Sequence, residues 1–291
     1  MMQRDSLSIR RLVMPGLLLL VVMAVAEAQP VKKPKPNKPK YGFLDTQFWL
    51  GVKFGTNLAN PMAQSQLSGF SPIDYPSDRL TKTYDSYALP GGQAGIEMTF
   101  YHRGFSVGLH PMYQRSRYRY TNSLEWKGEQ ESERFATIYE SEQRVDVINV
   151  PLFVKYDLIQ DGKLRPFVLG GGFYSFLVGA ERQVKITQTD YSFGAPQTID
   201  GGTLNLGVKD AFQNYYGWVA GGGASFDYWN IRTVIEITYN QSLNSVTREG
   251  TSQNELSSLG DQNDDVHLSH IVGSVSFVFP LRFIDKQFQA L

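Results

Sequence analysis

Cysteine is absent from this chain of 291 residues, so a disulfide framework and a metal site built on thiolate ligands are both excluded. An excess of charge of either sign is absent too, because 28 Lys and Arg residues balance 28 Asp and Glu residues. A protein that binds nucleic acid needs a basic excess to neutralise phosphates, so we expect no nucleic-acid partner.

Long apolar runs are absent after residue 28, where none approaches the roughly 18 residues that a membrane-spanning helix needs. The earlier run 12–26 follows three arginines and ends at Ala26-Glu27-Ala28, which has the small-residue pattern of a cleavage site. We therefore predict that residues 1–28 are a cleaved signal peptide and that the mature protein is exported. A membrane anchor is the alternative, although the run is short for one and ends in small residues.

The connections between strand-like runs alternate strictly between short and long. Short turns at 102–104, 161–162 and 228–230 alternate with long polar stretches at 58–90, 119–143, 181–214 and 244–265. This sorting is typical of an outer-membrane β-barrel, whose turns face the periplasm and whose loops face outward. A soluble sandwich has no reason to sort its connections in this way.

The runs themselves alternate apolar and polar residues with the period of a β-strand. Because lipid offers no partner to backbone amides, such strands must close into a barrel. We predict an all-β fold, an eight-stranded antiparallel transmembrane β-barrel at residues 46–283 with short periplasmic turns and long extracellular loops, followed by a periplasmic extension at 284–291. The strands are predicted at 46–57, 92–101, 104–118, 144–157, 164–179, 215–228, 230–241 and 267–281.

The short turns also predict strand register. A two-residue turn at Trp229-Asn230 places Asp227 opposite Arg232, so that opposite charges meet. The same turn also places Ala224 opposite Ile235 and Gly222 opposite Ile237. A turn of the same length at His102-Arg103 pairs Phe100 with Phe105 and Met98 with Val107.

Outward aromatic residues are expected to form two girdles, one at each membrane interface. The predicted members are Phe100, Phe105, Tyr156, Phe167 and Tyr228 near the short turns, and Tyr113, Trp218 and Tyr239 near the long loops.

The interior of an eight-stranded barrel is just wide enough to be filled by side chains. The glycine triplets 170–172 and 221–223 leave room there for large residues on neighbouring strands. Charges in such a narrow space must be paired, so we predict a plugged barrel with an internal ion-pair network and not an open pore. The candidate ion-pair residues are Lys53, Glu97, Lys155, Asp227, Arg232 and Glu236.

Residues 29–45 form a segment rich in lysine and proline. Proline blocks helix and sheet, and like charges repel, so the segment is predicted to be an extended periplasmic tail. It is either a plain spacer or an arm that contacts lipid phosphates, peptidoglycan or a partner protein. The candidate contact residues are Lys32, Lys33, Lys35, Lys38 and Lys40.

Three strands carry a resemblance to a known family. The run 147–156 contains Pro151-Leu152 and ends in Lys155-Tyr156, and the next run, 165–172, opens with Arg165-Pro166-Phe167 and ends in the first glycine triplet. With the opening run 49–57, they resemble the PorT-like outer-membrane β-barrel family over about 47–281. The resemblance implies a small integral outer-membrane protein of a Gram-negative bacterium, similar to barrels associated with type IX secretion and gliding machinery. The lysine-proline tail and the long polar loops depart from that family's pattern.

Some outer-membrane barrels are lipid-modifying enzymes, and a Ser/His/acid set is the combination to look for. The candidates are His110, Ser106, His270, Ser269 and Ser274. Ser106 and His110 share a face, but four strand residues separate them by roughly 13 Å. The chain has no G-x-S-x-G elbow, and the resemblance carries no catalytic residues over, so we predict no enzymatic activity and no cofactor.

Acidic residues gather in two of the long connections. Asp261, Asp264 and Asp265 lack the spacing of a calcium loop, so a solvated acidic loop is predicted there and no metal site. The second long connection holds a set of glutamates that could bind lipopolysaccharide phosphates through divalent cations or could serve only solubility. They are Glu125, Glu129, Glu131, Glu133, Glu140 and Glu142.

These features together predict a non-enzymatic accessory or structural barrel of an envelope complex, such as a type IX secretion or gliding machinery. Its partners would be outer-membrane lipid and lipopolysaccharide, with protein partners in the outer membrane or periplasm. The alternatives are a surface adhesin or ligand-binding barrel acting through the extracellular loops, a small pore, and a lipid-modifying enzyme.

Overall fold

The computed structural model describes the greater part of the predicted barrel. The described residues are 46–65, 80–127, 134–159, 162–191, 195–228, 231–248 and 264–281. The predicted signal peptide, the lysine contacts of the tail and the segment 284–291 lie outside these residues. Among the described residues, no helix has both the length and the apolar character that crossing a membrane requires.

The described part of the chain consists almost entirely of strands. They are β1 (Thr46–Ser65), β2 (Leu80–Tyr84), β3 (Pro90–His102), β4 (Phe105–Leu109), β5 (Met112–Lys127), β6 (Arg134–Asp157), β7 (Leu164–Asp190), β8 (Gln197–Gly207), β9 (Tyr215–Tyr228), β10 (Ile231–Ser242) and β11 (Asp265–Leu281). One 3₁₀ helix, η2 (Lys209–Ala211), precedes β9.

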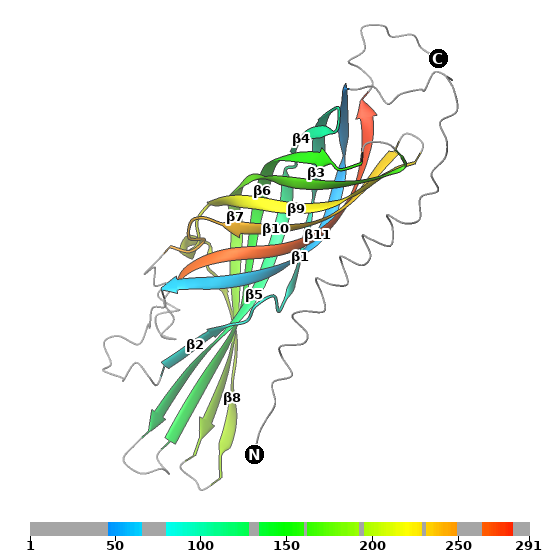
Figure 1. Cartoon of the computed structure of the whole chain (residues 1–291). Helices are drawn as coiled ribbons and strands as arrows, with labels where there is room; N and C mark the ends of the chain where they lie inside the picture. Colours follow the sequence, from blue (N-terminus) through cyan, green and yellow to red (C-terminus); the bar gives the residue numbers. More distant parts are fainter. Residues whose placement is uncertain are drawn as a thin grey trace, which may run out of the picture. The chain divides into compact units, whose positions relative to one another are not determined.

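Antiparallel pairing closes these strands into a ring (Figure 1). β1 pairs with β3 on one side and with β11 on the other, so the sheet has no free edge at this level. β4 and β5 both lie between β3 and β6, and they form a single ring position that is interrupted at His110-Pro111. The ring therefore has eight positions, and the predicted eight-stranded antiparallel barrel is confirmed.

The side chains of the ring follow the predicted inside-out pattern. Val52 is 44 % exposed and Leu152 is 55 % exposed on the outer wall, whereas Lys53 is 3 % exposed in the interior. Leaving this much apolar surface in water would cost about 25 cal/mol for each Å². An apolar wall around a charged interior is therefore stable only with lipid on the outside.

One predicted hairpin register is confirmed and another is wrong by two residues. Asp227 pairs with Arg232, and the two lipid-side pairs predicted beside it also form. In the β3–β4 hairpin, however, Phe100 pairs with Val107 and not with Phe105, and Met98 pairs with Leu109 and not with Val107.

The cause of this shift is the turn itself. Its two central residues are Arg103 and Gly104, with φ of 46° and 88°, and a two-residue hairpin turn of this kind needs positive φ at both positions. Strand pairing therefore continues to His102 and Phe105. A shift of two residues changes every partner but leaves each side chain on its predicted face.

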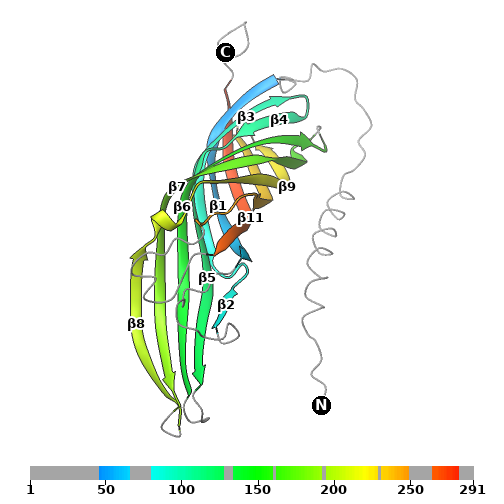
Figure 2. The same ribbon diagram turned by 90° about the vertical axis from the view of Figure 1, so that its left-hand side faces the viewer.

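Two of the predicted long loops are strands over most of their length. Tyr113, Ile148 and Phe176 lie side by side and all face outward, and beyond this level β5, β6 and β7 leave the apolar band and continue. β2 joins the outer side of β5, and β8 joins the outer side of β7 (Figures 1 and 2). We call this five-stranded continuation the extension. It consists of β2, β8 and residues 117–127, 134–144 and 181–190.

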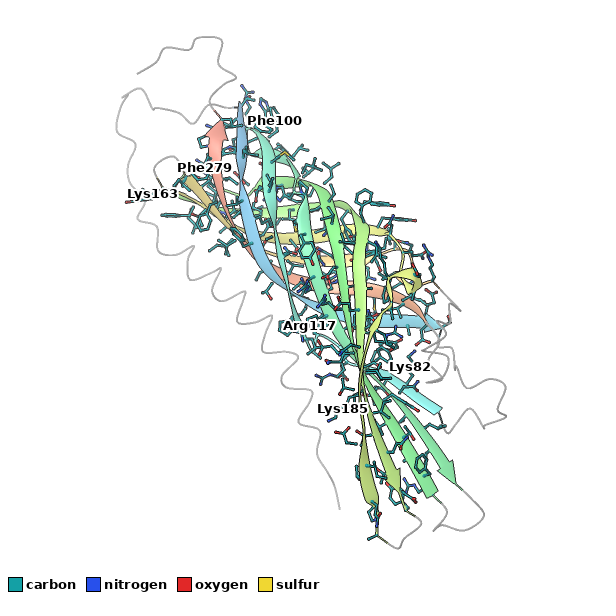
Figure 3. The ribbon with its side chains drawn as sticks, turned by 180° about the vertical axis from the view of Figure 1, so that it is seen from behind. Lys82, Phe100, Arg117, Lys163, Lys185 and Phe279 are labelled. Carbon is teal, nitrogen blue, oxygen red and sulfur yellow. The ribbon has the colours of Figure 1, made fainter. Side chains whose placement is uncertain are left out.

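Paired charges stabilise the outward face of the extension. Arg117 Nε donates to Glu142 Oε1 at 2.9 Å, and Arg144 Nη2 lies 2.8 Å from Glu181 Oε2. Opposite charges on neighbouring strands favour the sheet, and sequence reasoning that treated polar runs as loops missed this pairing. Lys185 lies in the extension, whereas Phe100 and Phe279 lie at the opposite end of the ring (Figure 3).

The end of the ring next to the extension has an apolar core of its own. Tyr118, Tyr120 and Tyr215 are almost completely buried there, with Phe212 following directly after η2. Phe212 forms a β-bridge with Thr247, which ties this segment to the residues after β10.

Candidate functional site

The interior charges come from strands all around the ring. Lys53 lies on β1, Glu97 on β3, Lys155 on β6 and Glu236 on β10. The residues paired with them across the strands are mostly small. Gly51 lies opposite Glu97, Gly95 and Ser276 flank Lys53, and Gly223 and Ser274 flank Glu236. These small neighbours leave the space that the long charged side chains occupy.

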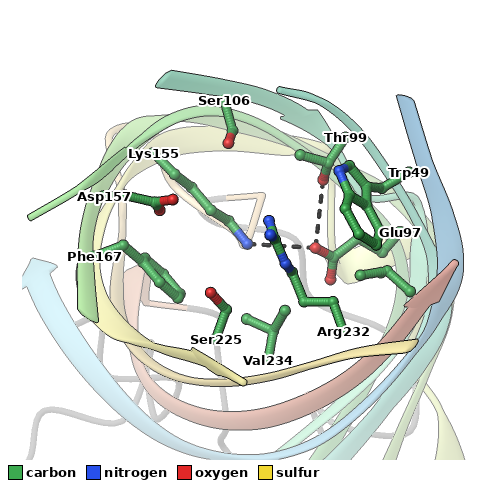
Figure 4. Close-up of a pocket in the computed structure, with 11 residues that line it drawn as sticks. Trp49, Glu97, Thr99, Ser106, Lys155, Asp157, Phe167, Ser225, Arg232 and Val234 are labelled. Carbon is green, nitrogen blue, oxygen red and sulfur yellow. Dashed lines mark hydrogen bonds and ion pairs between the residues drawn. The ribbon is translucent and has the colours of Figure 1, made fainter. Parts of the chain in front are cut away.

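Glu236 is the centre of the interior network. Its two carboxylate oxygens accept hydrogen bonds from different lysines, Oε1 from Lys53 and Oε2 from Lys155 at 3.1 Å. Lys155 Nζ also lies 3.4 Å from Glu97 Oε1, as Figure 4 shows. All four side chains are at most 7 % exposed, so they must be paired to be tolerated.

His110 joins this network at the break between β4 and β5. Its Nδ1 lies 3.3 Å from Lys53 Nζ, and its Nε2 lies 3.2 Å from Thr99 Oγ1 and 3.5 Å from Glu97 Oε1. The ring is fully buried and packs edge-on against Phe153. We call Lys53, Glu97, His110, Lys155 and Glu236 the inner network. Sequence analysis weighed His110 as a catalytic candidate on the face that it shares with Ser106 and did not include it among the ion-pair residues. Strand alternation, which puts Ser106, Gly108 and His110 on one face, was the signal for its interior position.

A second charged cluster lies closer to the short turns. Arg232 donates from Nε to Asp227 Oδ1 at 2.6 Å and from Nη2 to Oδ2 at 3.0 Å. Arg165 Nη2 lies 3.3 Å from the same carboxylate, and the Arg232 guanidinium lies 4.4 Å from the Trp49 ring. Two parallel hydrogen bonds of this kind are among the strongest that arginine forms with a carboxylate.

The structure therefore brings all six candidate ion-pair residues into the interior, in two groups. It adds Asp157 and Arg165, both of which are buried. The interior position of each follows from strand alternation. Asp157 lies two residues beyond Lys155 and so on the same face. Arg165 pairs with Ser225, which lies two residues from Asp227. The eight charges are balanced. Lys53, Lys155, Arg165 and Arg232 face Glu97, Asp157, Asp227 and Glu236.

The aromatic prediction needs one correction in the same region. Phe167 was predicted to face the lipid, but it is 3 % exposed and points inward, where its ring lies 5.0 Å from Lys155 Nζ. Phe167 lies on the same face of its strand as Arg165 and Leu169, which are also buried in the interior. Phe167 therefore fills the barrel and does not belong to the girdle.

Little free space remains between these side chains. A cavity of about 20 Å³ is bounded by Glu97, Lys155, Asp157 and Arg232 (Figure 4). That volume suffices for about one water molecule. A hydrated ion or a small solute does not fit into it.

The middle of the barrel is crossed by a chain of polar side chains. Ser175 Oγ donates to Asn149 at 3.3 Å, Asn149 donates to Gln114 at 2.9 Å, and Gln114 donates to Ser116 at 3.1 Å. Ser116 Oγ then lies 2.9 Å from Nε2 of His270 on β11. These bonds connect three adjacent strands to one across the interior.

The predicted catalytic candidates do not converge. His110 contacts Thr99 and Lys53, whereas Ser106 borders the small cavity. Ser116 and His270 have the spacing of a nucleophile and base, yet both are buried, and Ser116 already binds Gln114. Ser269 lies 3.5 Å from the carbonyl oxygen of Asn60, and Ser274 lies opposite Glu236.

Asp264 was predicted to be part of a solvated loop, but it is 1 % exposed. Tyr84 OH donates to its Oδ2 at 2.6 Å, and Lys82 Nζ lies 3.2 Å from the same oxygen. Burial and the nearby carboxylate raise the pKa of Tyr84 above its ordinary value, so the phenol keeps the proton that it donates. Within the described residues, no group of three or more His, Asp and Glu side chains is placed to hold a metal ion.

Comparison with known proteins gives a family. The family model described as "Outer membrane protein beta-barrel domain" matches residues 28–248. No curated protein matches the chain.

Several solved structures are similar to the chain at a low level. Neisserial surface protein A is 11 % identical, with a TM-score of 0.32, and the match covers 79 % of this chain and 95 % of that one. Ail, the attachment invasion locus protein of Yersinia pestis, is 10 % identical, with a TM-score of 0.30 and coverage of 80 % and 99 %. The outer membrane protease OmpT from Escherichia coli is 11 % identical, with a TM-score of 0.30 and coverage of 84 % and 99 %. Likenesses at this level carry no argument about function.

Proposed function

The chain belongs to the outer membrane protein beta-barrel domain family, and on that premise we propose that it is a non-enzymatic barrel that binds other macromolecules through its extension. The family indicates the outer membrane of a Gram-negative bacterium. The observation that carries the proposal is a contrast between two parts of the barrel. Paired charges fill the interior, whereas the strands continue beyond the apolar band as an ordered sheet.

The orientation follows from the connections. Barrels of this kind place their short turns in the periplasm and their long connections outside the cell. The turn at Arg103-Gly104 lies at one end of the ring, and the extension continues from the other (Figure 1). The extension is therefore assigned to the outer face.

Two specific roles fit such a barrel. The first is an accessory or structural subunit of an envelope complex, such as a type IX secretion or gliding machinery. The resemblance of the runs 147–156 and 165–172 to PorT-like barrels supports this role. In that role, the five lysines at 32–40 and the segment 284–291 would supply periplasmic contacts.

The second role is a surface adhesin or ligand-binding barrel, and the extension itself favours it. Its inner face exposes apolar side chains, with Ile199 57 % exposed, Leu204 41 % exposed and Phe135 36 % exposed. Exposed apolar surface, where it is contiguous, marks interaction sites. A lipid-modifying enzyme is less favoured, because His110 and His270 are both buried.

Shortening the extension is expected to abolish binding and leave the barrel folded. Leu124 pairs with Thr137, and Thr187 pairs with Asp200, so residues 125–136 and 188–199 can each be replaced by an Asn-Gly turn. We expect at least a tenfold loss of envelope proteins that co-purify from gently solubilised outer membranes, measured by quantitative mass spectrometry. The shortened barrel should still migrate as a heat-sensitive compact species on gels.

Deleting residues 30–40 from the full-length protein is the matched control. An unchanged set of co-purifying proteins after shortening, together with its loss after the tail deletion, would contradict binding through the extension. That outcome would indicate that the contact lies on the periplasmic side.

A further inference from the structure

β8 forms one edge of the extension. It pairs with β7 on one side, and among the described strands none pairs with its other side. Ten of its eleven residues are exposed, and the exception is partly buried. Its outer N–H and C=O groups are therefore available to another strand.

Protein edges of this length normally carry protection against pairing. Lysine, proline, short length and β-bulges are the usual devices. β2, at the opposite edge, has five residues and contains Lys82. β8 has neither lysine nor proline, and its single charge is Asp200, whose side chain accepts a hydrogen bond from Gly202 N at 2.9 Å. The device that β8 does carry is a bulge at Gly201, beside Gly202 with a φ of 89°.

That bulge makes the edge self-complementary. Ile199 pairs with Gln188 and Leu204 with Val184, so the extra residue at Gly201 brings Ile199 and Leu204 onto the same face. The strand is then symmetric about Gly201-Gly202. A second β8 laid antiparallel over this centre meets Ile199 with its own Leu204, and Leu204 with its own Ile199.

The same register also pairs the remaining residues well. Thr198 meets Asn205, and Asp200 meets Thr203, so the two aspartates do not face each other. The glycines at the centre present no side chain to the approaching strand. A contact in which each partner uses the same patch is the isologous type that two-fold symmetric dimers require.

We propose that β8 is a homotypic docking edge that pairs antiparallel with β8 of a second copy of this chain. This rests on the proposed function, because it needs the extension on the outer face. The extension leads away from the ring, and β8 runs along it (Figure 2). The two-fold axis that relates two antiparallel copies of β8 is perpendicular to the strands, so the extension of the second copy points in the opposite direction. The partner therefore belongs to a facing membrane, and the contact links two cells.

Engineered cysteines test the register directly, because the natural chain has none. Purified Ile199→Cys and Leu204→Cys proteins are mixed in detergent and oxidised, and a disulfide-linked dimer is expected from the mixture. Each variant alone should give at least tenfold less, because identical residues would lie roughly 17 Å apart in this register. A disulfide needs Cα atoms within about 7 Å.

A mixture of Thr198→Cys and Leu204→Cys is the matched control, since these residues lie on opposite faces. Cross-linking in the control or in the single variants that equals cross-linking in the mixture would overturn the proposal. So would the absence of cross-linking from all samples when the barrel is folded. Labelling Leu204→Cys on intact cells with a membrane-impermeant maleimide separates the two hypotheses. A labelled residue without cross-linking contradicts the β8 contact alone, whereas an unlabelled one contradicts the outer placement as well.

Aggregation of cells tests the biological consequence. Cells that carry the natural chain should clump, and the double substitution Ile199→Lys with Leu204→Lys should abolish clumping, because it places lysines opposite one another. Ile138→Lys is the control, since Ile138 is 37 % exposed on the other face of the extension. Equal clumping by both variants would contradict contact through β8.

Discussion

Replacing Glu236 with Gln is expected to lower the free energy of unfolding of the barrel by about 3–5 kcal/mol. Glu236 binds Lys53 and Lys155 at once, and removing its charge leaves two buried ammonium groups with only Glu97 to share. The uncompensated charge, and not the lost hydrogen bond, dominates the expected effect. Urea unfolding of the refolded barrel in lipid vesicles measures it.

Glu142→Gln is the matched control for this change. Glu142 pairs with Arg117 on the outer face of the extension, where the two side chains are 27 % and 36 % exposed. An exposed pair of this kind contributes about 0–1 kcal/mol. Equal losses for the two variants would mean that the interior charges are solvated, and the plugged-barrel account would be wrong.

Replacing Gly171 with Ala is expected to prevent normal assembly, whereas the same change at Gly170 should be tolerated. A Cβ on Gly171 would collide with the carbonyl oxygen of Leu152 and lie 2.6 Å from Cα of Phe153. A Cβ on Gly170 faces the lipid and lies 3.9 Å from its nearest neighbour. The clash is with backbone, so the expected cost reaches or exceeds the upper end of the ~1–3 kcal/mol typical of overpacking.

The fraction of heat-sensitive folded barrel after refolding compares these two glycine variants. Their chemistry is identical and their positions are adjacent, so any difference reports the packing between β6 and β7. Equal folding yields would contradict the close approach of these two strands.

The ring could be predicted because lipid imposes a simple rule on it. Strands alternate with a period of two, and the lipid side must be apolar, so the faces of Lys53, Glu97 and Glu236 follow from parity alone. The register at Asp227 and Arg232 followed from the turn length. Where the turn was misplaced by one residue, the register at Phe100 and Phe105 shifted by two, and the faces were still right.

The extension could not be predicted from the same rule. Both of its faces meet water or other protein, so its outward face carries polar side chains. Runs such as Arg117-Tyr118-Arg119-Tyr120 alternate, but without an apolar outer wall they resemble a polar loop. The cross-strand pairing of Arg117 with Glu142 and of Arg144 with Glu181 also distinguishes the extension. Such pairing becomes visible when the register is known.

Contacts between residues that are distant in sequence were missed for a related reason. Asp264 belongs to an acidic run, and its burial depends on Lys82 and Tyr84 of β2, which are distant in sequence. That placement does not follow from local pattern. The interior face of His110 does follow from alternation, whereas its contacts with Lys53 and Glu97 depend on strands that are distant in sequence.

The central claim is that the interior is closed and that the protein acts through the extension. Single-channel recording of the purified barrel in planar bilayers tests this most directly. The account predicts no steady conductance above that of the bare bilayer, because the interior charges are paired and the cavity among them holds about 20 Å³. Stable, reproducible conductance steps from the folded protein would contradict it and identify the barrel as a pore.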